Sequence, residues 1–139
     1  MSIKMFDYAE VMKLLKSGRK KAILDYDLRD AIFTRTDFSG IDLSGVNFTS
    51  ADLNGANLRG ANLNGANLRG ANLDHSCYPL SRNSLHIKAD KRLACQLAYH
   101  LCSLQCDDAD YIKMRNSILD FANQFHRVGE CGELEEREI

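Results

Sequence analysis

A five-residue repeat is the feature that most limits how this 139-residue chain can fold. Its clearest stretch, residues 51–73, reads ADLNGANLRGANLNGANLRGANL. Two residues before each Leu of this stretch stands an Ala, and looser copies of the pattern precede it, so every repeat offers one large and one small apolar side chain. The large residues of the whole series stand five positions apart, at Leu28, Phe33, Phe38, Leu43, Phe48, Leu53, Leu58, Leu63, Leu68 and Leu73.

A period of five fits neither common secondary structure. An amphipathic helix needs apolar residues at spacings of three and four, and a half-buried strand needs strict alternation. Coils of about twenty residues with four short sides do fit, because each side can then send its large and its small residue inward. Glycine two residues after the large one suits the corner between sides, since it adopts backbone conformations that other residues avoid. Such glycines stand at Gly40, Gly45, Gly55, Gly60, Gly65 and Gly70.

The repeat, written A-[D/N]-L-x-x, resembles the motif of the pentapeptide-repeat family over about residues 25–74. Five consecutive copies, the first at Ala51, carry the resemblance. It implies a right-handed quadrilateral β-helix of about 2.5 coils. Earlier copies depart from the motif, with Ile32 where Asp or Asn is expected and Thr36 and Val46 in the small column, which leaves a wider or irregular first coil open.

The segments on either side of the repeat predict α-helices, so the expected fold class is a mainly β solenoid with α caps. Residues 1–24 form an N-terminal capping helix, in which Asp7 and Glu10 have capping spacing and Gly18 suits the helix end. Such a helix would close the open end of the β-helix, since solenoids need caps. Residues 75–139 form a C-terminal helical extension.

The C-terminal extension predicts two helices. The first runs from about Asp90 to Leu104 and is apolar on two sides, so we expect it between the last coil and the helix that follows. The second begins near Asp107, Asp108 and Asp110 and runs to about His126. The closing polar residues 133–138 are expected to fray. The apolar stripes of the first helix are Leu93, Leu97, Leu101 and Leu104, opposite Cys95, Tyr99, Cys102 and Cys106, and the second helix has one face of Tyr111, Met114, Ile118, Phe121, Ala122 and Phe125.

Composition narrows the class of protein. The net charge is −1, which gives no general attraction to nucleic acid or to a membrane. Five cysteines, an odd number, and the absence of a signal-peptide pattern favour free thiols in a reducing cytoplasm. Basic residues interleaved with aromatics are also lacking, so direct nucleic-acid binding is not expected.

The cysteines and histidines are candidates for metal binding or catalysis, and the alternative for each is burial without a chemical role. A zinc site could draw on a cluster of histidines and cysteines near the C-terminus, but no Cys-x-x-Cys pair exists, and a free Cys commonly behaves as a small buried hydrophobe. The pairs Cys77 with His75 and Cys131 with His126 lack a third positioning residue. We therefore predict no enzyme, no catalytic residue, no cofactor and no metal. The zinc candidates were His100, Cys102, Cys106, His126 and Cys131.

Acidic residues of the early repeats are the candidate partner-binding residues. Asp and Asn at this position also suit bends, because their side chains can bond nearby backbone groups. Some members of the family resembled here are long acidic rods thought to imitate duplex DNA and to bind type II topoisomerases, which implies the same role for acids at matching positions. The candidates are Asp25, Asp27, Asp30, Asp37, Asp42 and Asp52.

These observations predict a non-enzymatic interaction protein. The expected partner is a protein, in particular a nucleic-acid-binding complex, and the expected role is a binder or inhibitor of a host nucleic-acid-processing machine. A phage or mobile-element anti-defence factor such as an anti-CRISPR would suit a chain of this size. Two alternatives stay open: a DNA-mimic modulator of a type II topoisomerase, and a dimeric structural adaptor whose C-terminal helices form the homodimer.

Overall fold

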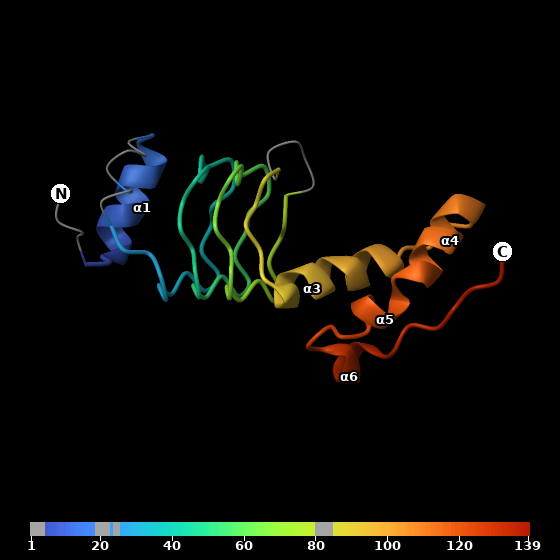
Figure 1. Ribbon diagram of the computed structural model, residues 1–139. Helices are drawn as coiled ribbons and strands as arrows, with labels where there is room; N and C mark the ends of the chain where they lie inside the picture. Colours follow the sequence, from blue (N-terminus) through green and yellow to red (C-terminus); the bar gives the residue numbers. More distant parts are fainter. Residues whose placement is uncertain (1–4, 19–22, 24–25, 80–84) are drawn as a thin grey trace. The chain divides into compact units, whose positions relative to one another are not determined.

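A computed structural model describes residues 5–18, 23, 26–79 and 85–139. The chain divides into two compact units, Met1–Ala89 and Asp90–Ile139. The first unit contains helix α1 and the repeat, and the second contains helices α3 to α6 (Figure 1). None of the described helices is long and apolar enough to span a membrane.

The repeat winds into stacked coils. Parallel bridges join Ile32 to Asp52, Asp37 to Asn57 and Asp42 to Asn62, and each joins residues twenty positions apart. Backbone hydrogen bonds connect the same coils on both sides of a bridge, from Phe33 N to Asp52 O at 2.7 Å and from Asp52 N to Ala31 O at 2.9 Å. The β-helix prediction is therefore confirmed, although the pairs are isolated bridges and not long strands. The right hand of the coil stays a prediction.

The interior of the coils is filled by the two predicted columns. From Phe33 to Leu68 the large residues have an exposed fraction of 0%, and Ala51, Ala56, Ala61 and Ala66 are equally buried. In the first coil the rings of Phe33, Phe38 and Phe48 pack edge to face, with centroids 5.1 to 6.1 Å apart. The bridge of Ile32 keeps the spacing of twenty, so the register holds in the first coil despite its departures from the motif.

The corners show why the motif carries Asp, Asn and Gly. Asp37 Oδ1 accepts a hydrogen bond from Ser39 N at 2.9 Å, and Asn57 Oδ1 accepts one from Arg59 N at 3.0 Å. These are Asx turns, which fix the bend. The next residue takes a left-handed conformation, with φ of 67° at Gly40 and 58° at Ser50.

The stack continues past the boundary that the sequence predicted. We expected the helical extension to begin at residue 75, but Asn57 pairs with Cys77 and Asn67 pairs with Lys88. Leu58 N donates to Cys77 O at 3.0 Å, and the unit ends at Ala89. The physical reason is that the last motif coil leaves backbone groups to be paired, and any extended segment can pair them. The boundary at 74 is therefore corrected to 89.

Helix α1, Tyr8–Lys16, begins as predicted. Asp7 is the N-cap and accepts a hydrogen bond from Glu10 N at 3.1 Å. The helix buries Val11, Met12, Leu14 and Leu15. The Tyr8 ring lies 5.9 Å from that of Phe33, and its hydroxyl is 3.1 Å from Thr36 Oγ1. The helix thus packs against the first coil, as a cap should (Figure 1).

The second unit contains α3, Lys91–Cys102; α4, Ala109–Ser117; α5, Leu119–Ala122; and α6, Val128–Cys131. Helix α3 packs against α5, and α4 also contacts α5. Both predicted N-caps are present, since Asp90 accepts from Leu93 N and Asp108 accepts from Asp110 N. The core consists of Tyr99, Cys102, Leu119, Ala122 and Phe125.

The predicted second helix is broken, which corrects its single run to His126. The break falls at Ile118, with φ −115° and ψ 8°. Ser117 Oγ donates to Met114 O at 2.6 Å, and Ile118 N bonds Arg115 O in a tighter turn, so the regular helical pattern stops. The break turns the apolar face, because Leu119 is buried while Phe121 is 37% exposed.

The two-sided burial predicted for the first C-terminal helix is also wrong. Cys95, Tyr99 and Cys102 are buried. On the other stripe, only Leu93 is buried, and Leu97, Leu101 and Leu104 are 38%, 42% and 53% exposed. The helix therefore packs through its cysteine and tyrosine side, and three leucines face solvent.

Candidate interaction surfaces

The predicted acidic residues lie on different sides of the coil. Asp25 lies outside the described residues, and Asp30 takes a corner position with φ of 61°. Asp37, Asp42 and Asp52 each form a bridge with an Asn or an Ile twenty residues away, in three separate columns. Asp27 stands twenty residues before Asn47, which belongs to the fourth column. The structure therefore does not bring these carboxylates together on one face.

Four of these carboxylates, those of Asp27, Asp37, Asp42 and Asp52, also accept hydrogen bonds in local turns. Asp27 binds Arg29 through Nη2 at 2.8 Å and Nε at 2.9 Å, and the side-chain hydrogen bond from Arg29 lowers the pKa of Asp27 to about 2. Hydrogen bonds from Ser39 lower the pKa of Asp37, and the charge of Lys16 adds a smaller effect in the same direction. The Asx-turn explanation of these residues is therefore correct for the described ones, and both carboxylates stay ionised at neutral pH.

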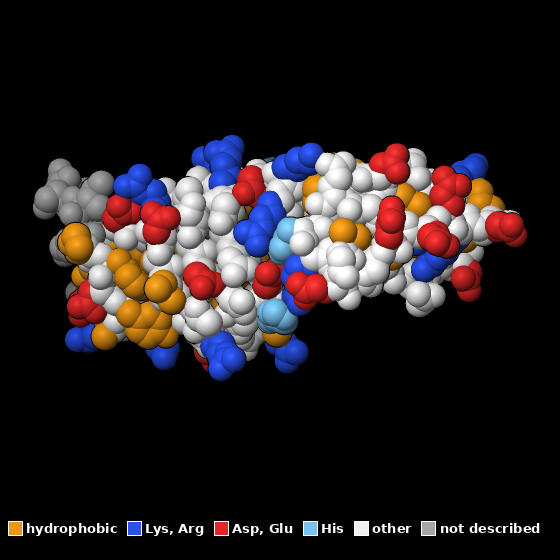
Figure 2. Space-filling model, turned by 90° about the horizontal axis from the view of Figure 1, so that it is seen from below, with side chains coloured by type: hydrophobic (Ala, Val, Ile, Leu, Met, Phe, Trp, Pro, Cys, Tyr) orange, Lys and Arg blue, Asp and Glu red, His pale blue; other side chains and the backbone are white. Residues whose placement is uncertain are grey.

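Asp27, Asp37 and Asp42 form an acidic band around the first coil, and Asp52 lies in the next coil beside Ile32, so the acids do not form a stripe along the stack. Below Asp37 and Asp42, twenty residues on, stand the neutral Asn57 and Asn62. On the face seen in Figure 2, acidic and basic side chains alternate over this unit. Duplex DNA carries phosphate charges in continuous rows, so an imitation of DNA is not what this distribution favours.

An exposed apolar side chain stands beside the same band, at a position that was not among the predicted partner-binding residues. Ile32 is 66% exposed and pairs with Asp52, at the outward position that Asp or Asn fills on the other sides. At the start of α1, Tyr8 is 47% exposed, and Met5, which precedes the helix, is 89% exposed. Figure 2 shows hydrophobic side chains gathered over α1 and the first coil. In the sequence, this surface is indicated only by Ile32, which stands where the motif has Asp or Asn.

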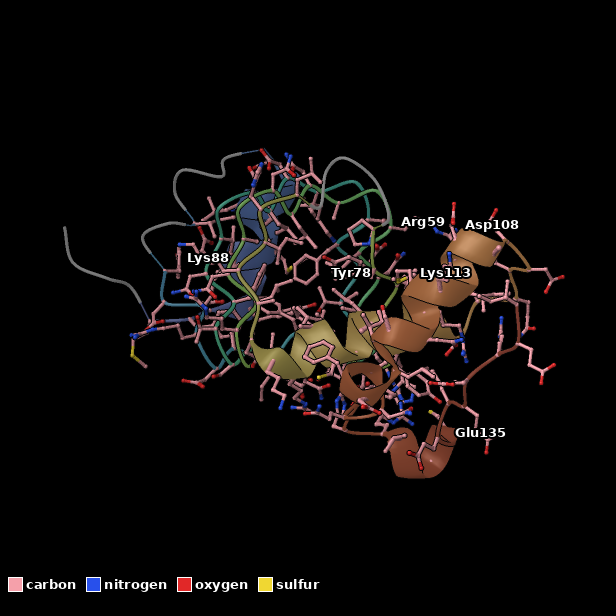
Figure 3. All side chains as sticks on the ribbon, turned by 45° about the vertical axis from the view of Figure 1, so that its right-hand side comes forward. Arg59, Tyr78, Lys88, Asp108, Lys113 and Glu135 are labelled. Atoms are coloured by element: carbon pink, nitrogen blue, oxygen red, sulfur yellow. The ribbon has the colours of Figure 1, made fainter. Side chains whose placement is uncertain are left out.

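A second surface lies in the other unit, where helices hold the C-terminal tail, residues 132–139. Asn123 Nδ2 donates to Leu134 O at 2.9 Å, and its Oδ1 accepts from Leu134 N at 2.9 Å. Asn116 makes the same pair of bonds to Arg137, at 2.8 and 3.1 Å. The predicted fraying of residues 133–138 is therefore wrong, because side chains supply the partners that a neighbouring strand would supply. Glu135, labelled in Figure 3, belongs to this segment.

Arg115 connects this tail to helix α3. Its side chain is 2% exposed, and its Nε donates to Cys102 O at 2.7 Å, at the end of α3. Its Nη1 donates to Glu135 O at 2.7 Å. A cation at a helix C-terminus is favourable, since the last carbonyl groups carry partial negative charge. No sequence pattern marked this residue, because a buried Arg is rare.

The candidate metal ligands and thiols are dispersed. Among the described residues, no three His, Cys, Asp or Glu side chains lie close enough to hold a metal ion. Cys95 and Cys102 are buried, and burial raises the pKa of the Cys102 thiol. Cys77 and Cys131 are exposed.

With the coil geometry established, comparison with known proteins identifies the repeat. The family model for pentapeptide repeats matches residues 27–49 and 41–77, with eight copies. Residues 27–77 are pentapeptide repeats. The match includes Cys77, in agreement with the bridge from Asn57 to Cys77. No curated protein matches the chain significantly.

Among solved structures, the pentapeptide-repeat chain is similar to a pentapeptide repeat protein, Rfr23, from the cyanobacterium Cyanothece 51142. The two share 35% sequence identity with a TM-score of 0.36. The alignment covers 48% of this chain and 45% of that chain, so this chain spans less than half the length of Rfr23.

Proposed function

We propose that this pentapeptide-repeat chain is a non-enzymatic interaction protein of the cytoplasm that binds a protein partner through its first coil. The proposal rests on a difference between the outward-facing residues of the first coil and those of the next coil. The first coil presents Asp37, Asp42 and the exposed Ile32 at outward positions, whereas the next coil presents the neutral Asn57 and Asn62 below the two acids and Asp52 below Ile32. A mixed apolar and charged surface on a rigid backbone is a common basis for specific recognition.

The acidic band supports a partner with a basic surface. We propose in particular that the partner is a nucleic-acid-processing complex of a host cell, and that the chain inhibits it, as a phage or mobile-element anti-defence protein such as an anti-CRISPR would. Carboxylates on three sides of the first coil, with Asp52 on the fourth side of the next coil, would suit a basic groove that encloses the end of the stack. The low pKa of Asp27, set by Arg29, keeps its carboxylate charged over the physiological pH range.

Capture of the partner tests this proposal. Immobilised full-length protein should retain one partner from a host lysate, and the variant with Asp37, Asp42 and Asp52 all changed to Asn should retain at least tenfold less. The substitution preserves the turns, because Asn57, Asn62 and Asn72 already accept the same type of backbone hydrogen bond. Added duplex DNA should displace the partner if the chain occupies a nucleic-acid-binding surface.

A charge-matched control separates the band from net charge. Changing Glu133, Glu136 and Glu138 to Gln alters the net charge by the same three units but leaves the first coil intact. This control should retain the partner as the wild type does. Equal capture by the Asp variant and the wild type would refute the proposal. A captured partner that duplex DNA does not displace would refute the specific proposal of a nucleic-acid-processing complex.

A second candidate function is a dimeric adaptor, which the exposed leucines of α3 favour. Leu97 and Leu101 lie one turn apart on α3, Leu104 follows the end of that helix, and all three are at least 38% exposed. A second copy could cover them. Light scattering should then give twice the chain mass for the wild type and the single mass for Leu101→Glu, and a monomeric wild type would exclude this function.

A further inference from the structure

The tail of the second unit is held almost entirely through its backbone. Tyr99 Oη donates to Gly132 O at 2.6 Å, Asn123 bonds both backbone groups of Leu134, and Asn116 bonds both backbone groups of Arg137. Such bonds are available to any extended peptide, because every residue except proline carries the same N–H and C=O groups. Helices α3, α4 and the turn after α5 thus present a set of side chains that binds a backbone.

Each of the two asparagines meets one residue of the tail. Asn116 lies on α4 and bonds Arg137, and Asn123 follows α5 and bonds Leu134. Leu134 and Arg137 are three residues apart, which in an extended chain is about 10 Å. The tail runs antiparallel to α4 and α5, because Leu134 bonds the later asparagine and Arg137 the earlier one.

Two side chains of the tail also make contacts, and these would give the surface a preference for particular peptide sequences. Leu134 packs against the core of Tyr99, Cys102, Leu119, Ala122 and Phe125. Arg137 Nη1 donates to Leu104 O at 3.1 Å. The glutamates at 133, 135, 136 and 138 are exposed. The surface therefore selects an apolar residue followed three positions later by arginine, and it leaves the intervening residues free to vary.

We propose that the face formed by Tyr99, Arg115, Asn116 and Asn123 is a binding site for extended peptides of a protein partner, of the form apolar-x-x-Arg, and that the chain's own tail is its resident ligand. The tail follows Gly132, whose φ is 93°, so rotation at this flexible residue can release it. A partner peptide would then replace it at the same bonds. This inference deepens the proposed function by adding a second contact with a protein partner.

A labelled peptide of residues 132–139, GELEEREI, tests the proposal on the full-length chain. In one variant, Leu134→Ser and Arg137→Ala weaken the resident tail. This released chain should bind the peptide at least tenfold more tightly than the wild type, because a tethered tail competes at a high effective concentration. Adding Asn123→Ala should weaken binding at least tenfold, whereas Gln124→Ala, the adjacent control, should leave it within twofold.

Altered peptides test which side chains matter. GSLSSRSI replaces the four glutamates but keeps Leu and Arg, and it should bind within threefold of GELEEREI. GESEESEI lacks both Leu and Arg and should not bind. Absence of saturable binding to the folded released chain would overturn the proposal. Equal effects of Asn123→Ala and Gln124→Ala would overturn it too.

A measurement on the wild type covers the case in which the released chain does not fold. The backbone N–H groups of Leu134 and Arg137 should be protected from hydrogen exchange, and excess GELEEREI should remove that protection by displacing the tail. Unchanged protection at saturating peptide would overturn the inference. Neither result depends on the acidic band, so failure here is distinguishable from failure of the lysate capture.

Discussion

Replacement of Leu63 by alanine tests the filled interior of the coil most directly. Leu63 is 0% exposed and lies in the middle of the stack. The backbone around it is bonded on both sides, since Asn62 N donates to Ile41 O of the preceding coil at 2.9 Å and Gly65 N donates to Leu85 O, which comes later in the chain, at 3.0 Å. The coils therefore cannot move together to close a void, because their separation is set by these bonds.

The expected loss of stability follows from this rigidity. Removing three carbon atoms from a buried site costs about 2.4 kcal/mol at about 0.8 kcal/mol each. A cavity that cannot collapse adds to this, so we expect a total of about 4 kcal/mol, in the upper part of the range for buried leucines. The exposed Ile32 provides the control within the same unit, and Ile32→Ala should cost less than about 1 kcal/mol.

Native-state hydrogen exchange of the Asn62 amide measures this loss within the coil itself. A loss of about 4 kcal/mol corresponds to a fall in protection of roughly three powers of ten. This readout avoids the assumption that both units unfold together. If Leu63→Ala and Ile32→Ala changed the protection equally, the inward direction of the leucine column would be wrong.

Three further predictions concern the corners, the charges and the thiols. Ser50→Gly should raise the free energy of unfolding by about 1 kcal/mol, because Ser50 has a φ of 58°, and urea unfolding checks it. Arg29→Ala should raise the pKa of Asp27 from about 2 toward 3.8, as an NMR titration of the carboxyl group would show. The stability from this carboxylate is present above pH 3.8 and is lost as the pH falls through about 2, so the variant, in which the pKa is no longer lowered by Arg29, should lack this contribution. A thiol reagent should modify the exposed Cys131 rapidly and the buried Cys102 slowly.

Each of these predictions has a matched control. Ser39 has no positive φ, so Ser39→Gly should destabilise the coil, and stabilisation by both variants would contradict the corner argument. The pKa of Asp37 should not change in Arg29→Ala, since Ser39 lowers it. Equal modification rates for Cys102 and Cys131 in the folded chain would show that the helical core is open.

The coil could be predicted from the sequence because every repeat solves the same packing problem. The period of five predicts which residues point inward, and together with the coil length it also predicts the side of the coil on which each residue lies. No two of Asp27, Asp37, Asp42 and Asp52 differ by a multiple of twenty, so their placement on four sides follows from their numbers once the coil length is known. The predicted end of the stack was too early, because the residues after Leu73 no longer match the motif.

The residues near that end nevertheless keep the spacing. Ser76 and Tyr78 stand five positions after Ala71 and Leu73, so the small and large columns continue although Ala and Leu do not. Backbone pairing at Cys77 and Lys88 then needs no motif at all. A boundary based on residue identity therefore falls earlier than one based on hydrogen bonding.

The C-terminal unit was harder to predict, because its decisive interactions join side chains to backbone. The break at Ile118 depends on the hydroxyl of Ser117, and the order of the tail depends on Asn116 and Asn123. Composition describes the tail as polar, and polarity alone predicts fraying. The spacing of the residues does not show which asparagine bonds which backbone group, so these contacts could not be predicted from the sequence.

The constant four-sided turn described above restricts how such a chain can change its length. Gain or loss of a single pentapeptide would carry every later residue to the adjacent side, a quarter turn about the axis, while the buried columns would remain continuous. Gain or loss of four pentapeptides would restore the original orientation and move the later residues only along the axis, by about 4.8 Å. Length variants that differ by one repeat are thus equally well packed but display their outer side chains in different directions.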